Sequence, residues 1–293
     1  MICFDPHIHM SSRTTDDYEN MVKAGIKGVV EPAFWMGQPR SSVGSFIDYF
    51  DLLIGWERFR ASQFGIHHYC TIGINPKEAN DKVLAKEVLK ILPRYLAKDG
   101  VVAVGEIGFD DITAKEEYFL SEQMILAEKM KLPILIHTPH RDKIGGTKRT
   151  LALIKEMGID EEMVLIDHLD EQTLPLVLET NCWRGHSIYP NTKMSESRMV
   201  ALLKQYGTEK MVINSAADWG VSDPLKVPKT AKAMLEAGFS HEDVNRVVFQ
   251  NPIAFYAQSD KITEKEVASE IKIDQRKRWM ENSTLRGQEP IVQ

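Results

Sequence analysis

The stretch VVAVGEIGFD, residues 101–110, decides the fold class. Its first four residues are apolar and mostly β-branched, which is typical of a strand in a parallel sheet that is buried on both faces. The runs ILI at residues 134–136 and VLI at residues 164–166 have the same character. Glu106 ends the first of these runs between glycines, which allow a backbone or a ligand to approach closely. The pattern predicts a parallel α/β protein with a polar side chain at a strand end.

Strand-like and helix-like segments alternate along the rest of the chain. Predicted strands cover residues 2–4, 28–30, 68–74, 101–107, 134–136, 164–166, 182–188 and 211–214. Predicted helices cover residues 15–24, 84–97, 116–131, 148–157, 197–206, 228–237 and 241–256, with another helical segment inside residues 35–65. Eight strands alternating with helices over roughly 260 residues are the count and size of a (β/α)8 TIM barrel.

We therefore predict one TIM-barrel domain over residues 1–260, followed by a C-terminal helical extension and tail over residues 261–293. An open doubly wound sheet is the alternative, but that fold would normally need fewer strands or a second domain.

The composition is that of a globular protein with ample apolar material for a core. The chain has 293 residues, of which 43% are hydrophobic and 27% charged, and its net charge is −6. This acidic balance argues against a broad basic face for nucleic acid. The three cysteines, Cys3, Cys70 and Cys182, lie in apolar runs, as expected in a reducing compartment. No signal peptide and no membrane span is recognisable, so we expect a cytoplasmic protein.

Six candidate metal ligands follow five of the predicted strands. They are His7 and His9 after the first strand, Glu106 after the fourth, His137 after the fifth, His168 after the sixth and Asp218 after the eighth. Alternate residues of an extended chain point to the same side, so the two histidines of MICFDPHIHM can aim at one point. The active site of a TIM barrel is assembled at the C-terminal ends of its strands. Each residue alone would more often be structural, but their joint occurrence predicts a metal site.

The chemistry of these side chains fits two divalent ions. Imidazoles and carboxylates suit Zn²⁺, Mn²⁺, Ni²⁺ or Fe²⁺, and Mg²⁺ is a further candidate. Two neighbouring metals need a bridging carboxylate, and Glu106 is the natural candidate because each of its oxygens can take one metal. We expect Asp218 to ligate one metal and to act as the general base that accepts a proton from water. Glu31, which follows the second strand, is a candidate for orienting a ligand histidine.

The order of these motifs resembles the TatD-type metal-dependent hydrolases of the amidohydrolase superfamily. The resemblance covers about residues 1–257 and rests on HxH, GEIG, the later histidines and the final aspartate, with FQNPIAFY similar to the family's closing helix. It implies a TIM barrel, two divalent metals and hydrolysis, in known members often of DNA. It also implies that His7, His9 and Asp218 hold the first metal, that His137 and His168 hold the second, and that Glu106 contacts both.

Three departures from the family pattern concern the substrate rather than the metals. The usual GxHP after the third strand is GINP here, which puts Asn75 where a histidine typically faces substrate, and AADWG at residues 216–220 replaces ETDxP. The segment at residues 35–65 is longer than the compact family pattern. Candidate substrate contacts are Asn75, His140, Arg141, His186 and Trp219, with Trp35 and Tyr189 as further residues near the strand ends.

We therefore predict a binuclear metallohydrolase that acts on a small ester, such as a phosphoester, a lactone or a carboxyl ester. A DNA 3′-exonuclease is the alternative within the enzymes; the acidic charge and the altered motifs do not favour nucleic acid as the partner. A third alternative is a catalytically silent barrel that serves as a binding or assembly subunit, which would have no need for all six ligands. The substrate, the metal and the oligomeric state stay open.

Overall fold

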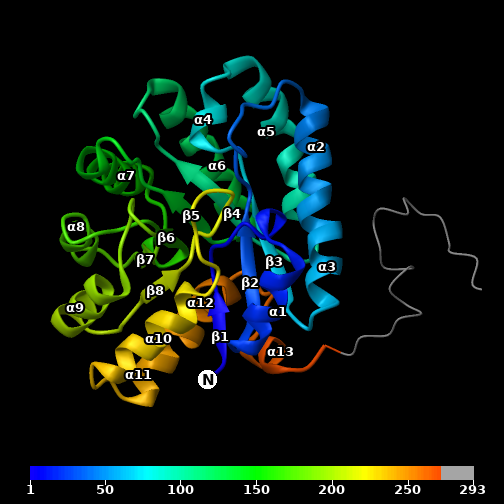
Figure 1. Cartoon of the computed structure of the whole chain (residues 1–293). Coiled ribbons are helices and arrows are strands. Elements are labelled where there is room, and N and C mark those ends of the chain that lie inside the picture. Colours follow the sequence, from blue (N-terminus) through cyan, green and yellow to red (C-terminus); the bar gives the residue numbers. More distant parts are fainter. Residues whose placement is uncertain (272–293) are drawn as a thin grey trace, which may run out of the picture.

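The computed structural model, which describes residues 1–271, contains one barrel of eight parallel strands. The strands follow one another in chain order, and helices surround them on the outside (Figure 1). Their bounds are β1 Cys3–Asp5, β2 Ile26–Pro32, β3 His67–Ile72, β4 Val101–Gly108, β5 Ile134–His137, β6 Val164–Ile166, β7 Trp183–Ser187 and β8 Met211–Asn214. The predicted (β/α)8 TIM barrel is confirmed.

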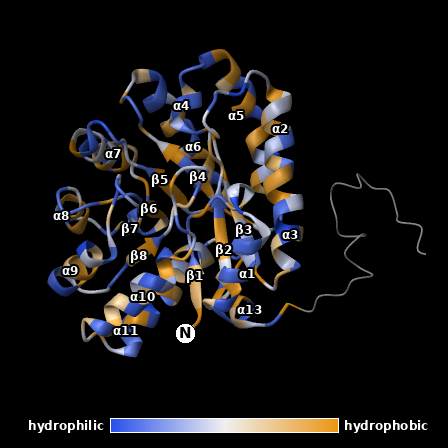
Figure 2. Ribbon diagram, viewed as in Figure 1, coloured by the Kyte–Doolittle hydropathy of each residue, from blue (hydrophilic) through white to orange (hydrophobic). Residues whose placement is uncertain are grey.

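Helices connect the strands and cover the barrel. They are α1 Thr15–Lys23, α2 Val43–Asp51, α3 Arg58–Ser62, α4 Pro76–Ala79, α5 Lys82–Leu96, α6 Ala114–Met130, α7 Lys143–Met157, α8 Leu174–Leu178, α9 Glu196–Tyr206, α10 Lys226–Glu236, α11 His241–Asn245, α12 Asn251–Ala257 and α13 Glu264–Ala268. Short 3₁₀ turns are η1 Met10–Ser12 and η3 Glu161–Met163, and π-helical turns are η2 Leu52–Glu57 and η4 Arg246–Gln250. The strands are largely hydrophobic, whereas the helices carry both kinds of residue (Figure 2), as expected for helices with one face on the core.

The chain segments that follow β1 and β8 lie side by side. The backbone N–H of His9 donates to the carbonyl of Ala217 over 2.9 Å, and the N–H of Ala216 donates to the carbonyl of His7 over 2.8 Å. These bonds join the two ends of the sheet at its C-terminal edge. They bring the HxH segment next to the loop that carries Asp218.

Two glycines let β4 pack closely against β5. A Cβ atom on Gly105 would lie 2.7 Å from the Cβ of Leu135. Gly108 has a φ of +147°, and a Cβ there would lie 2.2 Å from the carbonyl oxygen of His137. A side chain at either position would push the strands apart. The close approach places Glu106 beside His137.

Two helical predictions differ from the structure in detail. Residues 35–65 form α2, η2 and α3 in succession, with the side chain of Ser42 capping the start of α2. The predicted helix over residues 241–256 is divided by the π-helical turn η4. In the predicted extension after residue 260, the described residues contain the helix α13, and residues 272–293 lie outside the described part of the chain.

None of the described helices combines the length and the apolar character that a membrane span requires.

Candidate metal centre

Three of the predicted ligands form a tight group at the C-terminal ends of the strands. The ligand atoms of His7, Glu106 and His168 all lie within 4.8 Å of one another. The three residues are 2–3% exposed. They come from the end of β1, from β4 and from the loop after β6, so the barrel brings together residues that are far apart in sequence. Buried imidazole and carboxylate groups that converge in this way are typical of a metal site.

Glu106 lies at the centre of the group. Its Oε1 is 3.0 Å from Nδ1 of His137 and 3.0 Å from Nε2 of His168, while its Oε2 accepts a hydrogen bond from Nδ2 of Asn75 over 3.2 Å. Burial opposes ionisation, but the positive charge and hydrogen bonds of the histidines outweigh it and lower the pKa of Glu106 well below its usual value. The carboxylate is therefore ionised and turns its two oxygens toward different partners.

His7 is oriented by a buried carboxylate. Its Nδ1 is 2.6 Å from Oδ2 of Asp167, and both oxygens of Asp167 accept from Nδ2 of Asn214 at 3.0 and 3.1 Å. A proton on Nδ1 leaves Nε2 of His7 unprotonated, which is the form that binds a metal. That nitrogen lies 3.4 Å from Nε2 of His9. Burial lowers the pKa of His9 to about 4, so the ring of His9 is neutral near pH 7.

His168 has an unusual backbone conformation and two polar contacts on its ring. Its φ is +62°, in the left-handed region that side chains other than glycine seldom adopt. Nδ1 of its ring is 2.6 Å from Oγ of Ser187 and 3.1 Å from Nζ of Lys193. Burial, together with the charge of Lys193, lowers the pKa of His168 well below its usual value. The ring is neutral, and its Nε2 faces Glu106.

Asp218 lines the same cavity but is not part of the tight group. Its Oδ1 accepts hydrogen bonds from the hydroxyl of Tyr189 over 2.8 Å and from the N–H of Gly220 over 2.9 Å. Its backbone carbonyl accepts from the guanidinium of Arg13. Among the described residues, no donor bonds Oδ2 of Asp218, so this oxygen is available to a ligand.

The residues present fit divalent metal ions. All six predicted ligands line one cavity of about 610 Å³. Nε2 of His7 and Nε2 of His9 lie 3.4 Å apart, and among residues 1–271 the buried Nδ1 of His9 has no hydrogen-bond partner. Imidazoles that surround an ionised carboxylate form a donor set for divalent metal ions. The structure thus contains a candidate His/Glu metal centre at the predicted place.

Two of the predicted substrate residues line this cavity, and a third stacks on one of its lining residues. Asn75 and His140 line it. Trp219 is 49% exposed and stacks on Phe34, with 6.2 Å between ring centroids, and its ring lies 6.4 Å from that of His9. Phe34 and Trp219 therefore form an aromatic side of the cavity next to His9.

The structure does not bring the other two substrate candidates to the cavity. The side chain of Arg141 is 84% exposed and pairs with Asp111 over 3.1 Å, because the loop after β5 turns outward beyond His140. His186 is completely buried, and its Nδ1 faces the carbonyl of Leu169. It lies on β7 itself and below the strand end, so the expectation that it faces substrate is wrong.

Glu31 also differs from its expected role. It accepts hydrogen bonds from the N–H and the hydroxyl of Ser11, and its Oε2 is 2.9 Å from Nε2 of His68. None of these partners is a predicted ligand. Glu31 therefore fixes the turn after His9 rather than the ring of a ligand histidine.

Sequence reasoning missed several residues that contact the ligands, among them Asp167, Ser187 and Lys193. Asp167 orients His7, and its position directly before His168 at a strand end was a signal that could have identified it. Lys193 contacts His168 from the loop between β7 and α9. Burial lowers the pKa of Lys193 to about 8. A lysine within a loop carries no periodic signal, so its position in the cavity cannot be predicted from the sequence.

Comparison with known proteins identifies relatives over most of the chain. The sequence profile of TatD-related DNases matches residues 4–257. An uncharacterized metal-dependent hydrolase of Methanocaldococcus jannaschii is 29% identical over 257 residues, which are 86% of this chain and 98% of that protein. The crystal structure of a TatD-like protein from Archaeoglobus fulgidus has a TM-score of 0.72 at 28% identity, and the match covers 86% of this chain and 99% of that one.

More distant structures share the fold. An organophosphorus hydrolase variant from Deinococcus radiodurans has a TM-score of 0.63 at 15% identity, covering 87% of this chain and 92% of that one. A TatD homologue from Escherichia coli K12 has a TM-score of 0.63 at 17% identity, covering 87% and 98%. At these identities the likeness shows the fold alone. Because the profile spans nearly the whole barrel, the resemblance seen in the motifs is confirmed, and the chain belongs to the TatD family of metal-dependent hydrolases.

Proposed function

We propose that the chain is a binuclear divalent-metal-dependent hydrolase that cleaves an ester or phosphoester of a small substrate. The observation that supports this proposal is that all six predicted ligands line one cavity, three of them in a tight buried group. In the proposed assignment His7, His9, Asp218 and Glu106 hold one ion, and His137, His168 and Glu106 hold the other.

The ligands are prepared for this role by their surroundings. When bound, two divalent ions supply Lewis acidity, which polarises the scissile group and lowers the pKa of water. Glu106 is suited to bridge them because it is ionised, buried and turned toward different partners through its two oxygens. Asp167 holds the ring of His7 so that Nε2 faces Glu106. Burial also keeps His9 and His168 in the neutral form that binds a metal.

Asp218 is the proposed general base. The hydroxyl of Tyr189 and the N–H of Gly220 hold its Oδ1, which fixes the carboxylate and leaves Oδ2 free to accept a proton. Asn75 and Phe34 line the cavity in which a substrate would lie, and Trp219 stacks on Phe34. A base must be within hydrogen-bond reach of the proton that it abstracts, and the position of Asp218 in the cavity supports this role.

The test combines metal analysis with turnover. Purified protein is expected to hold close to two divalent ions per chain by elemental analysis, and to cleave chromogenic phosphodiesters, lactones or carboxyl esters. Asp218→Asn keeps a neutral oxygen but cannot take a proton, so kcat should fall about 10²–10⁴-fold while at least one ion stays bound. Asp223→Asn is the matched control, because Asp223 lies on the same loop and pairs with Lys229 instead. Unchanged turnover in Asp218→Asn would end its assignment as the base.

DNA hydrolysis is the second candidate function, because the matching profile is that of TatD-related DNases. The net charge of −6 does not favour it. Incubation of the metal-loaded protein with end-labelled single-stranded DNA separates the two functions. Stepwise shortening from the 3′ end, at a rate that exceeds the rate on small esters, would favour the exonuclease.

A further inference from the structure

A second cavity adjoins the metal cavity. It has a volume of about 360 Å³ and shares four lining residues with the metal cavity: His140, His168, Thr192 and Lys193. Lys143, at the start of α7, lines it from the other side. These four residues therefore form the common boundary of the two cavities, and a group held beside His168 lies next to both.

Two lysine ammonium groups meet at the boundary between the cavities. Nζ of Lys193 lies 3.1 Å from Nδ1 of His168, and Nζ of Lys143 donates to the carbonyl oxygen of the same residue. Both side chains are half-buried. Among residues 1–271, no carboxylate lies within ion-pair distance of either ammonium group. Partly buried cations of this kind are normally paired, because taking a charge out of water is costly.

The other charged groups of the second cavity already have partners. Arg198 bonds Glu171 through Nε over 2.7 Å, and Arg141 bonds Asp111. Two aspartates also line the cavity, but each is turned to the backbone: Asp142 accepts from the N–H of Gly145, and Asp170 accepts from the N–H groups at the start of α8. Within residues 1–271, Lys143 and Lys193 are thus the charged side chains of this cavity that have neither an ion pair nor a cap to make, in a chain whose net charge is −6.

We propose that Lys143 and Lys193, here called the lysine subsite, bind an anionic group of the substrate while its ester lies at the metal centre. The substrate class is then a small ester with a phosphate or carboxylate group a few bonds from the scissile bond. This inference rests on the proposed hydrolase for the position of the ester. An anion between the two ammonium groups would supply the missing counterion and screen their mutual repulsion.

Binding of three matched probes tests the subsite without relying on turnover. Butyrate, succinate and 3-phosphonopropionate share one carboxylate and a two-carbon spacer, and they differ in whether the far end is a methyl, a carboxylate or a phosphonate. Isothermal titration calorimetry of each probe into the metal-loaded protein measures affinity. We expect succinate and 3-phosphonopropionate to bind about 10- to 100-fold more tightly than butyrate, which is the range for hydrogen bonds to charged groups. Whichever of succinate and 3-phosphonopropionate binds more tightly shows whether the subsite prefers a carboxylate or a phosphonate.

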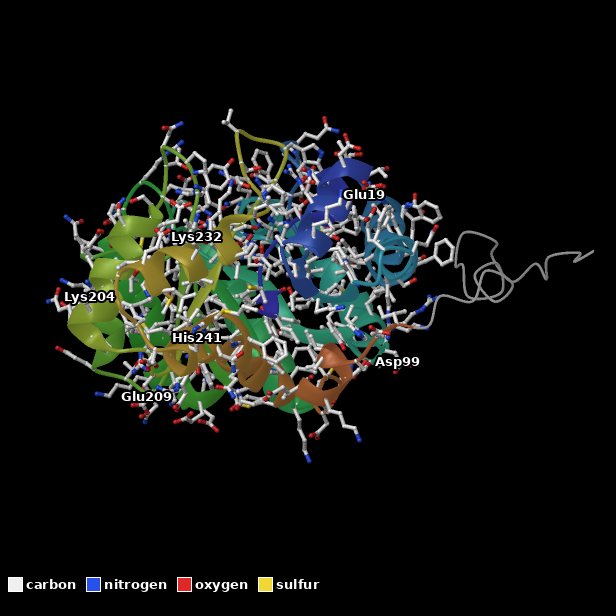
Figure 3. All side chains as sticks on the ribbon, turned by 60° about the horizontal axis from the view of Figure 1, so that its bottom comes forward. Glu19, Asp99, Lys204, Glu209, Lys232 and His241 are labelled. Atoms are coloured by element: carbon white, nitrogen blue, oxygen red, sulfur yellow. The ribbon has the colours of Figure 1, made fainter. Side chains whose placement is uncertain are left out.

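Substitution of each lysine tests whether Lys143 and Lys193 cause the tighter binding of the doubly anionic probes. Lys143→Gln and Lys193→Gln should each lower the preference for the doubly anionic probes about tenfold and leave butyrate unchanged, whereas Lys193→Arg should retain it. Lys204→Gln is the matched control, since Lys204 is an exposed lysine of α9 on the outside of the barrel (Figure 3). Elemental analysis of every variant shows whether the ions are still bound, because Lys193 contacts His168.

The outcomes separate the subsite from the proposed function. Equal binding of all three probes, no binding of any probe, or a preference that survives in the double variant Lys143→Gln/Lys193→Gln would each overturn the lysine subsite. A protein that holds no metal yet still prefers the doubly anionic probes in a lysine-dependent manner would overturn the metallohydrolase and support the subsite.

Discussion

Replacement of Asp167 by asparagine tests how strongly the residues behind the ligands control metal binding. The carboxylate of Asp167 receives hydrogen-bond donors on both oxygens. Oδ1 accepts from the N–H of His168 over 2.7 Å and from Asn214, and Oδ2 faces Nδ1 of His7 over 2.6 Å and again accepts from Asn214. An asparagine has one acceptor oxygen and one amide group that only donates. Whichever way it is turned, the amide group faces two donors.

The orientation that keeps the bond from the N–H of His168 turns the amide group toward His7. Nδ1 of His7 can then only accept, so the proton moves to Nε2, the nitrogen that faces Glu106. A protonated nitrogen cannot bind a metal. We expect metal affinity to fall about 10–100-fold, as for other partners of ligand histidines. Because the lost hydrogen bond involves a charged group, the free energy of unfolding of the metal-free protein should fall by about 1.5–3 kcal/mol.

Competition with a chromogenic chelator measures the affinity, and urea denaturation of the chelator-treated protein measures stability. Asp170→Asn is the control, because it makes the same charge change three residues along the same loop, and Asp170 accepts from the backbone N–H of Thr173 instead of touching a ligand. Wild-type metal affinity in Asp167→Asn would refute the proposed protonation of His7, even if the variant were less stable. Equal losses in both variants would show that the effect is one of charge alone.

Two further predictions concern β4. Glu106→Gln should lose the binuclear centre while the fold is retained, because the amide offers one acceptor where a bridge needs two anionic oxygens; elemental analysis that still finds both ions would show that another group bridges them. Gly108→Ala should lower the free energy of unfolding by about 1–3 kcal/mol, since its Cβ would lie 2.2 Å from the carbonyl oxygen of His137. Gly158→Ala also changes a glycine of positive φ but meets no atom within 4 Å, and urea denaturation should show a smaller loss for it.

Where the sequence carries a local physical signal, the prediction agrees with the structure. The apolar runs at residues 164–166 and 211–214 coincide with β6 and β8, since buried parallel strands must be apolar on both faces. The candidate ligands were found because they follow such strands directly. The barrel then brings them to one cavity.

Where the position of a residue depends on contacts that are distant in sequence, the prediction from the sequence was less accurate. Helix α7 begins at Lys143 rather than at residue 148, because the carboxylate of Asp142 caps a first turn that contains two glycines of low helix propensity. His186 follows the alternation of β7, but the depth of the strand in the barrel buries it. Lys193 reaches His168 only through the path of its loop.

The two sides of the metal cavity differ in chemistry, and this difference bears on how a substrate would be oriented. Phe34 and Trp219 stack beside His9, whereas the lysine subsite contacts His168. An ester with one anionic end can satisfy both sides in only one direction, so its scissile bond would meet the metal centre in a single orientation. Binding energy from the anionic end would then position the reacting group as well as retain the substrate. Removing that end should therefore lower kcat as well as raise KM.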